Sequence, residues 1–545
     1  MIKNRIVECK TINSKIDLYY KNILNKSQRI FTALDRDEHS PTYGSFDRDY
    51  WHYKIRDFSS MVLHQASLTL NSLYSWNYKE NIFFQKDILK EWIEGSIEHW
   101  CKQQLGNGSF NEYYPNEEGY PPTAFSLYAT VLLVLDKGCD DKNVLHQIEK
   151  SCNWLLIKPE IEASNQEAVG ICSVYLASKI TGVNVDTERL EGRFSRFFDT
   201  QKEEGWFPEY NGPDIGYLSV TIDALWDYYR YSQDERALLS IRNAADFIEL
   251  FFTDNGNIPV MINSRNTDYV VPYGIFNLAR IDENYLSLFY KLLKKMTDPF
   301  NFLETTDDRY LCHYVYTSSV RAINVLQHLK DFQQIKVKKF PDKFFKDSGI
   351  VIKNTSNCTV YINMKKGGIV YIYNEEGLFY TNHGFRYIDG KVVGVSHWLT
   401  EKNEIKIDVG LDEVQIMIKG DFVSRSWLVP TPFKHTVLRL VSFSIGRRII
   451  PILKRIFIFG DKNIKIYYER KLMVSMKKTS IEDNITSNSQ KLNMNNIKLS
   501  KGYSLRHVSS AARFTPDELL LNDKNSTTIS ETKKETLVSK VDIQC

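Results

Sequence analysis

Two polar residues at predicted helix starts have side chains that can hold a carboxylate or move a proton. Asn165 follows Ser164, which forms an S-x-x-E capping box with Glu167 and so marks the start of a helix. Free backbone N–H groups and the helix dipole favour an anion at such a terminus. Tyr217 lies at the mouth of a later helix, where a tyrosine near cations can act as a general base or acid. Alternatively, Asn165 only belongs to an ordinary helix start, and Tyr217 is an aromatic side chain packed in the core.

Further candidates lie in polar turns along the same part of the chain. Arg265 stands in the polar stretch 263–269 and can bind a carboxylate or phosphate in bidentate fashion, or pair with a neighbouring Asp. The turn that precedes Tyr217 and the equivalent earlier turn supply Glu209, Tyr210, Asp214 and Glu112. We expect these side chains to contact a ligand.

Two other segments combine charge and aromatic character. Residues 44–58 alternate aromatic and charged side chains, so Trp51 and Arg56 can face a ligand or belong to a structural lid. His383, in Asn382-His383-Gly384, is one of only 11 histidines and can serve as a partner acid or base, although a lone histidine is more often structural.

A repeated turn phrase organises these candidates. It reads Asn107-Gly108-Ser109-Phe110, then Glu204-Gly205-Trp206-Phe207, and more loosely Asn255-Gly256-Asn257-Ile258. The glycines are 97 (205−108) and 51 (256−205) residues apart. The repeating unit is therefore near fifty residues, and one copy is missing between Gly108 and Gly205. Each copy lies between helix-like stretches, so the unit is a helix pair stacked on its neighbours. Such pairs can close into a ring with a bowl where the turns meet.

The periodicity changes after about residue 340, where alternating apolar residues and Gly-containing turns predict antiparallel strands. We therefore expect an α+β multidomain protein, with an N-terminal α/α toroid followed by a C-terminal antiparallel β-sandwich. The expected boundaries are an irregular segment over 1–40, the toroid over 41–335, the sandwich over 342–522 and a disordered tail over 523–545.

Residues 437–459 form a basic, apolar segment interrupted too often by Arg and Lys to span a bilayer. It can lie on an anionic membrane surface or dock as a helix against the β domain.

Composition narrows the classes of partner. The net charge of +3 is small, so bulk electrostatics indicate no nucleic-acid partner, and 13% aromatic content with 32 Tyr suits carbohydrate or a large helical core. Eight cysteines contain no CxxC pair, and we expect neither a metal nor a cofactor. The N-terminus has no apolar run of signal-peptide length, so we expect a cytoplasmic protein, with contact at the inner membrane surface left open.

Domain order and the residues above resemble the heparinase II/III-like polysaccharide lyases and their alginate-lyase relatives. The resemblance implies that Asn165 neutralises a uronate carboxylate, that Tyr217 acts as base and acid, and that His383 is a loose counterpart of the histidine in the family's sandwich. Gln166 stands where the family commonly has His. The implied reaction is β-elimination on an acidic polysaccharide, with Arg265 adding positive charge and no metal required.

Two other functions remain open from the sequence. A toroidal glycoside hydrolase would use two carboxylates, for which Glu112, Glu209 and Asp214 qualify. A non-catalytic glycan-binding or assembly factor would have aromatic residues in the bowl but would need no pair of catalytic acid and base. The glycan and the oligomeric state are not indicated.

Overall fold

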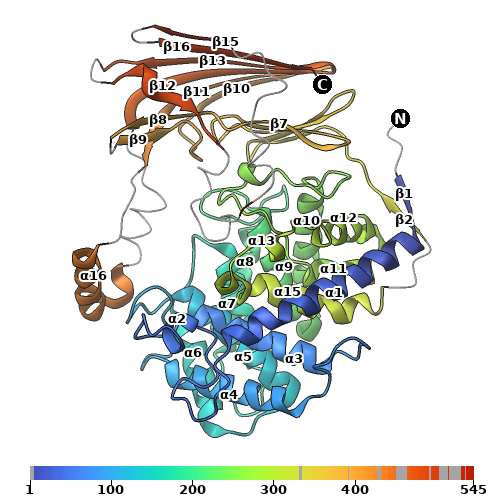
Figure 1. Cartoon of the computed structure of the whole chain (residues 1–545), viewed down its shortest axis with the longest axis vertical. Helices are drawn as coiled ribbons and strands as arrows, with labels where there is room; N and C mark the ends of the chain where they lie inside the picture. The colour runs from blue at the N-terminus through green and yellow to red at the C-terminus, as the bar shows by residue number, and fades with distance from the viewer. Residues whose placement is uncertain are drawn as a thin grey trace.

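The computed structural model describes residues 5–329, 334–390, 392–410, 412–425, 431–449, 463–489, 492–501, 514, 529–533 and 536–544. Two bodies are stacked, with helices at one end and two β-sheets at the other (Figure 1). The expected α/α toroid and antiparallel β-sandwich are confirmed.

The helical body is a closed double ring. Six inner helices contact one another in the cyclic order α3, α5, α7, α9, α11, α15 and back to α3. Their bounds are Ser67–Ser75, Tyr120–Lys137, Ser164–Ala177, Ile215–Ser232, Tyr273–Ile281 and Tyr314–Leu326. The outer helices α4, α6, α8, α10 and α12 span Asp87–Gln103, Lys142–Ile157, Thr187–Asp199, Glu235–Glu249 and Leu286–Met296. Short helices connect them: α2 (Arg48–Trp51), η1 (Met61–Ala66), η2 (Val260–Ile262), η3 (Glu283–Tyr285), α13 (Phe302–Thr305) and α14 (Asp308–Leu311).

Residue pattern decides which helix lies inside. The inner helix α5 is apolar around most of its circumference and almost wholly buried. The outer helix α8 buries only one stripe, which includes Leu190, Phe194 and Phe197. A helix that is apolar all round must be enclosed, whereas an amphipathic one can cover it.

The N-terminal segment, expected to be irregular over 1–40, instead contains β1 (Arg5–Glu8) and the 25-residue helix α1 (Cys9–Ala33). Helix α1 contacts α12 and α15, and so completes the outer ring. Ile12, Ile16 and Ile23 repeat at helical spacing and are buried. Strand β1 pairs with β2 (Gln334–Val337) just beyond the last inner helix.

The repeated turns have one geometry. In all three copies the N–H of the glycine bonds the carbonyl three residues earlier, as from Gly205 to Lys202 O at 2.8 Å. Gly108, Gly205 and Gly256 have φ of +93°, +102° and +79°. A Cβ on Gly205 would lie 2.2 Å from Asn243 O in the neighbouring outer helix. Glycine is therefore required both by the backbone conformation and by the close packing of the pairs.

The β body consists of two packed sheets. The inner sheet has the order β3-β4-β5-β6-β7, and the outer sheet has the order β14-β8-β9-β11-β12-β13-β16-β15 with β10 paired to β11. The inner strands are Lys343–Phe345, Ile350–Asn354, Thr359–Asn363, Ile369–Asn374 and Gly377–Asn382. The outer strands β8 to β16 are Phe385–Asp389, Val392–Val395, Glu404–Val409, Glu413–Arg425, Asn463–Ser475, Lys478–Ser487, Ile497–Leu499, Ile529–Lys533 and Thr536–Gln544, with η5 (Met494–Asn496) before β14.

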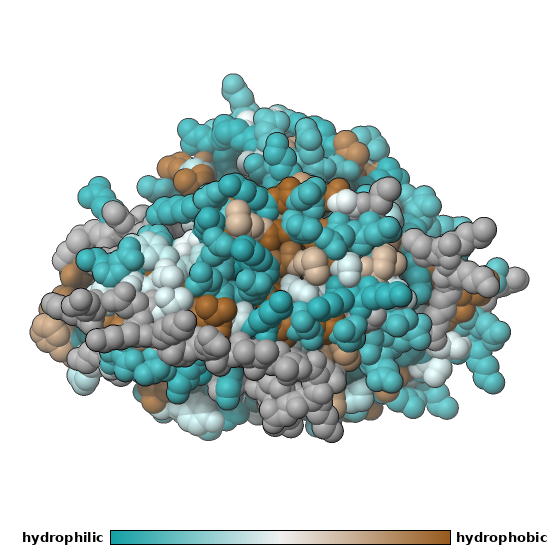
Figure 2. All heavy atoms as spheres, turned by 90° about the horizontal axis from the view of Figure 1, so that it is seen from above, coloured by the Kyte–Doolittle hydropathy of each residue, from teal (hydrophilic) through white to brown (hydrophobic). Residues whose placement is uncertain are grey.

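The inner sheet is buried on both faces. Val360, Ile362 and Ile372 pack against the outer sheet, while Tyr361 and Tyr373 belong to the core of the toroid. Tyr373 Oη donates to Ile258 O at 3.0 Å across this junction. Seen from the sandwich end, hydrophilic residues cover most of the described surface (Figure 2).

The C-terminal tail, expected to be disordered over 523–545, contains β15 and β16. Strand β16 pairs with β13, and its alternate residues Leu537, Val541 and Ile543 are buried. The segment is polar in composition, but every second residue of β16 is buried and most of these buried residues are apolar. This alternation is enough to form a strand with one buried face.

The basic segment expected over 437–459 lies partly in helix α16 (Pro432–Ile445) and η4 (Gly446–Ile449). Residues 450–459 lie outside the described residues. No described helix is both long and apolar enough to cross a membrane.

Candidate active site

The N-terminal ends of the inner helices carry the candidate residues. Asn165 is the second residue of α7, and Tyr217 is the third residue of α9. Because the inner helices repeat in one direction around the ring, these ends share a face. The turns on this face contact the sandwich: Asn363 Nδ2 donates to Ile262 O at 2.6 Å, and Lys366 Nζ donates to Asn263 O. The β domain therefore covers part of the face that presents the candidate residues.

The start of α7 contains buried polar atoms that the described residues leave unsatisfied. The atoms without a described hydrogen-bond partner are Asn165 Oδ1, Gln166 Oε1, Glu209 Oε2 and Arg265 Nε. The Arg265 guanidinium lies over the Tyr210 ring at 4.7 Å, and Gln166 Nε2 is 3.5 Å from the Tyr210 hydroxyl. Buried polar atoms are nearly always hydrogen-bonded, so this group calls for a polar ligand or ordered water.

Glu209 fills the anion position at the helix terminus. Its Oε1 accepts the N–H of Asn165 at 2.6 Å, so the helix start that was expected to hold a ligand's carboxylate already holds a protein carboxyl group. The side chain is 1% exposed, and burial raises its pKa well above the usual range, although the Asn165 N–H acts in the opposite direction. Burial therefore shifts the equilibrium toward the protonated, neutral form.

Asp214 has a structural position beside this group. It accepts the N–H of Tyr217 at 3.2 Å, the N–H of Arg265 at 3.0 Å and the hydroxyl of Thr267. Both carboxylate oxygens are therefore used to cap α9 and to hold the 263–268 loop. These contacts position Tyr217 and Arg265, and the expected contact of Asp214 with a ligand stays a prediction.

Tyr217 belongs to a belt of tyrosines. Its ring centroid lies 6.4 Å from that of Tyr269, and the Tyr269 hydroxyl is 2.7 Å from the hydroxyl of Tyr314. Tyr310 Oη is a further 3.0 Å from Tyr314 Oη. Burial raises the pKa of Tyr269 and of Tyr314 well above the usual range. Phenol groups from several inner elements are thus brought together around Tyr217.

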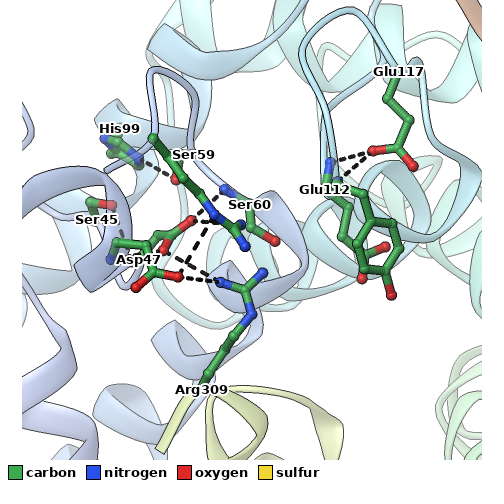
Figure 3. Close-up of polar contacts among 11 residues, drawn as sticks. Ser45, Asp47, Ser59, Ser60, His99, Glu112, Glu117 and Arg309 are labelled. Atoms are coloured by element: carbon green, nitrogen blue, oxygen red, sulfur yellow. Dashed lines mark hydrogen bonds and ion pairs between the residues drawn. The ribbon is translucent and has the colours of Figure 1, made fainter. Parts of the chain in front are cut away.

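Glu112 and Glu117 form a second acidic pair on the loop before α5. Glu117 Oε2 accepts the backbone N–H groups of Glu112 and Tyr113 at 2.6 and 2.8 Å (Figure 3). Burial raises the pKa of both carboxyl groups, and the proximity of Glu112 raises that of Glu117 further. Tyr113 hydrogen-bonds the Glu112 carboxylate, so its phenol group lies beside a buried acid.

Arg56 and Arg309 provide positive charge next to this pair. Asp47 lies 3.8 Å from Arg56 Nη1 and 3.5 Å from Arg309 Nη1, and Asp49 lies 3.7 Å from each arginine (Figure 3). Both arginines lower the pKa of Glu112, against the larger effect of burial. Arg56 therefore lies near Glu112, and its contact with a ligand stays a prediction.

The polar groups of Trp51 and His383, two of the predicted site residues, bind other parts of the protein. Trp51 Nε1 donates to Ala33 O at 2.8 Å and ties α2 to the end of α1. His383 Nε2 is 3.0 Å from the Tyr371 hydroxyl, on the inner sheet, and the side chain is buried. These contacts favour structural roles.

Four site residues were not predicted: Tyr113, Glu117, Arg309 and Tyr314. Tyr113 directly follows Glu112, and Glu117 lies five residues after Glu112 on the same loop, so the turn that contains Glu112 pointed to this region. Arg309 is separated from Asp47 by 262 residues, and only ring closure brings them together. Among the described residues, no group of three or more His, Cys, Asp or Glu could hold a metal ion.

The fold is shared with known proteins. No protein-family model and no curated protein sequence matches the chain. A chondroitin AC lyase from Streptomyces coelicolor, solved with chondroitin sulphate, aligns with 97% of this chain and 77% of its own at a TM-score of 0.51. The chain shares the fold of this lyase. At 6% sequence identity the likeness concerns the fold alone.

Two further lyase structures align over most of the chain. A Paenibacillus xanthan lyase aligns with 97% of this chain and 70% of its own, at 9% identity and a TM-score of 0.47. A Pedobacter heparinus heparan sulfate lyase aligns with 88% and 75%, at 9% identity and a TM-score of 0.38.

Proposed function

We propose that the protein cleaves a uronate-containing polysaccharide by β-elimination at the N-terminal ends of α7 and α9. The observation that carries the proposal is the group of unsatisfied buried polar atoms on Asn165, Gln166, Glu209 and Arg265. Asp214 links this group to Tyr217, because it accepts the backbone N–H groups of both Arg265 and Tyr217. A sugar carboxylate could use the donors of this group, and its hydroxyls could use the acceptors.

The proposed chemistry follows from these positions. Asn165 and Arg265 bind the uronate carboxylate and stabilise the charge that develops on it when C5 loses its proton. A protonated Glu209 does not repel that carboxylate, and its Oε2 can donate a hydrogen bond to it. The Tyr217 oxygen, as phenolate, takes the C5 proton. The C4–O bond breaks, a C4=C5 double bond forms, and the proton passes from Tyr217 to the departing oxygen.

Acidic polymers such as chondroitin, heparan sulfate, xanthan and alginate provide the test. We expect a rise in ultraviolet absorbance from the unsaturated uronate product. Tyr217→Phe should lower kcat by about 100-fold or more, because general acid–base groups contribute that much. Tyr231→Phe is the matched control, since Tyr231 lies at the opposite end of the same helix and is 39% exposed. Equal loss in both variants, or full activity in Tyr217→Phe, would remove Tyr217 from the mechanism.

A glycoside hydrolase is the second candidate, favoured by the paired carboxyl groups of Glu112 and Glu117. Hydrolysis would depend on such a pair, so Glu112→Gln would abolish activity while Tyr217→Phe would not. Binding of the polymer without turnover, unaffected by either change, would indicate a non-catalytic glycan-binding protein.

A further inference from the structure

Helix α16 extends from the sandwich to the rim of the toroid. It lies in the connection between β11 and β12, and Figure 1 shows it beside α2, away from both sheets. Arg439 binds Asp57 in bidentate fashion, with both N–O distances at 2.7 Å. Gly446 lies against Glu118 and Asn116, next to the loop that carries Glu117. The helix therefore lies against the loop that carries Glu117.

The outward side of α16 is apolar. Phe433, Val437, Leu440 and Phe443 are 77%, 40%, 66% and 81% exposed. Their spacing of four, three and three residues puts them on one stripe of a helix. Large apolar side chains exposed together on one element mark an interaction surface, whereas scattered single ones do not.

The charge of the surrounding sequence is one-sided. Residues 422–460 contain seven Lys or Arg and no Asp or Glu, although the whole chain has nearly equal numbers of each sign. Of the described basic residues here, Arg448 is exposed in η4, and Arg439 remains 49% exposed beside Asp57. This charge complements an anionic surface.

We propose that α16 docks the protein onto an anionic lipid bilayer, with Phe433, Leu440 and Phe443 inserted at the boundary between headgroups and acyl chains. Apolar insertion combined with basic flanks is how interfacial helices bind. The loop carrying Glu117 would then lie close to the lipid surface, so the site would act on glycan held near a membrane. Docking stands on the helix alone and does not depend on the proposed reaction.

The test is co-sedimentation of the full chain with phosphatidylcholine vesicles, with and without phosphatidylglycerol. We expect binding to the anionic vesicles that weakens as salt rises. Phe433→Ser/Phe443→Ser should lower the partition coefficient by about tenfold or more, since each change removes apolar burial from the bound state. Ile82→Ser/Phe300→Ser is the matched control, because these residues are 73% and 52% exposed in loops of the toroid. The control should bind as the wild type does.

Three results would overturn the proposal. The first is no binding of the wild-type chain to anionic vesicles at low salt. The second is binding that the Phe433→Ser/Phe443→Ser variant retains in full. The third is a concentration-dependent dimer that the same variant disrupts while vesicles remain unbound, because that result would assign the face to a second protein copy. Far-UV circular dichroism should be unchanged in both variants, since the altered side chains are exposed.

Discussion

Replacing Glu209 by Gln tests whether the carboxyl group at the start of α7 has a raised pKa. The amide keeps the shape of the carboxyl group and an oxygen that can accept the Asn165 N–H, now at 2.6 Å. It removes the titration of a side chain that is 1% exposed and whose pKa burial raises well above the usual range. The variant therefore separates the ionisation of Glu209 from its packing.

The raised pKa of Glu209 determines how the free energy of unfolding changes with pH. An unfolded glutamate titrates near pH ~4.3, whereas the folded chain holds the Glu209 proton at higher pH. The stability contributed by this group is complete below the unfolded pKa and is lost as pH rises toward the folded pKa. The loss is about 1.4 kcal/mol for each pH unit in that window. Glu209→Gln does not titrate, so its free energy of unfolding should fall less steeply by this amount.

Urea denaturation at a series of pH values and constant salt measures the slope. The control is Glu203→Gln, which changes an exposed glutamate in the same region and should leave the slope as in the wild type. Glu112, Glu117 and Asp223 also have pKa values raised by burial, but they contribute to every variant and cancel in the comparison. Parallel curves for Glu209→Gln and the wild type at all pH values above the unfolded pKa of glutamate would refute a raised pKa and the neutral Glu209 of the proposed reaction.

Three changes test the fold. Arg470→Met should cost about 3–5 kcal/mol in thermal or chemical denaturation, because it leaves the buried Asp483 carboxylate without the cation that lies 2.6 Å away. Ile543→Ala should cost about 2–5 kcal/mol, because this side chain of β16 is 0% exposed, and an effect below 1 kcal/mol would contradict the ordered tail. Gly205→Ala should destabilise the toroid by more than about 1 kcal/mol, since a Cβ would meet a carbonyl of α10 at 2.2 Å, whereas Gly106→Ala, with nothing within 4 Å, should not.

The ring was predictable because its signal is local and repeated. Each turn glycine marks a place where one helix pair packs closely on another, so Gly108, Gly205 and Gly256 could be recognised without knowing their neighbours. The same holds for outer-sheet strands such as β12, β13 and β16, in which buried residues alternate with more exposed ones.

The two ends of the chain were misjudged because their partners are distant. Helix α1 has helical periodicity in Ile12, Ile16 and Ile23, but its polar composition hid the fact that it closes the ring against α12 and α15. Strand β16 pairs with β13, but it belongs to a C-terminal segment, 523–545, that is rich in Ser, Thr and Lys, and this composition predicts disorder when the neighbouring strand is not known. Composition describes a segment in isolation, whereas burial depends on what covers it.

The candidate site was predicted in parts. Asn165 and Tyr217 were recognised by chemical type and by their position at helix starts, and Arg265 by its charge in a polar loop. The structure connects them through Asp214 and the turn that begins at Glu209. The sequence could not show that Glu209 occupies the helix terminus, because that contact joins two different inner pairs.

Product analysis after digestion of an acidic polysaccharide in water enriched in heavy oxygen distinguishes elimination through Tyr217 from hydrolysis. Elimination through Tyr217 predicts a fragment that ends in an unsaturated uronate and carries no heavy oxygen at the cleaved bond, and the Tyr217→Phe variant should form almost none of it. A saturated fragment labelled with heavy oxygen, formed equally well by that variant, would contradict the account and establish hydrolysis.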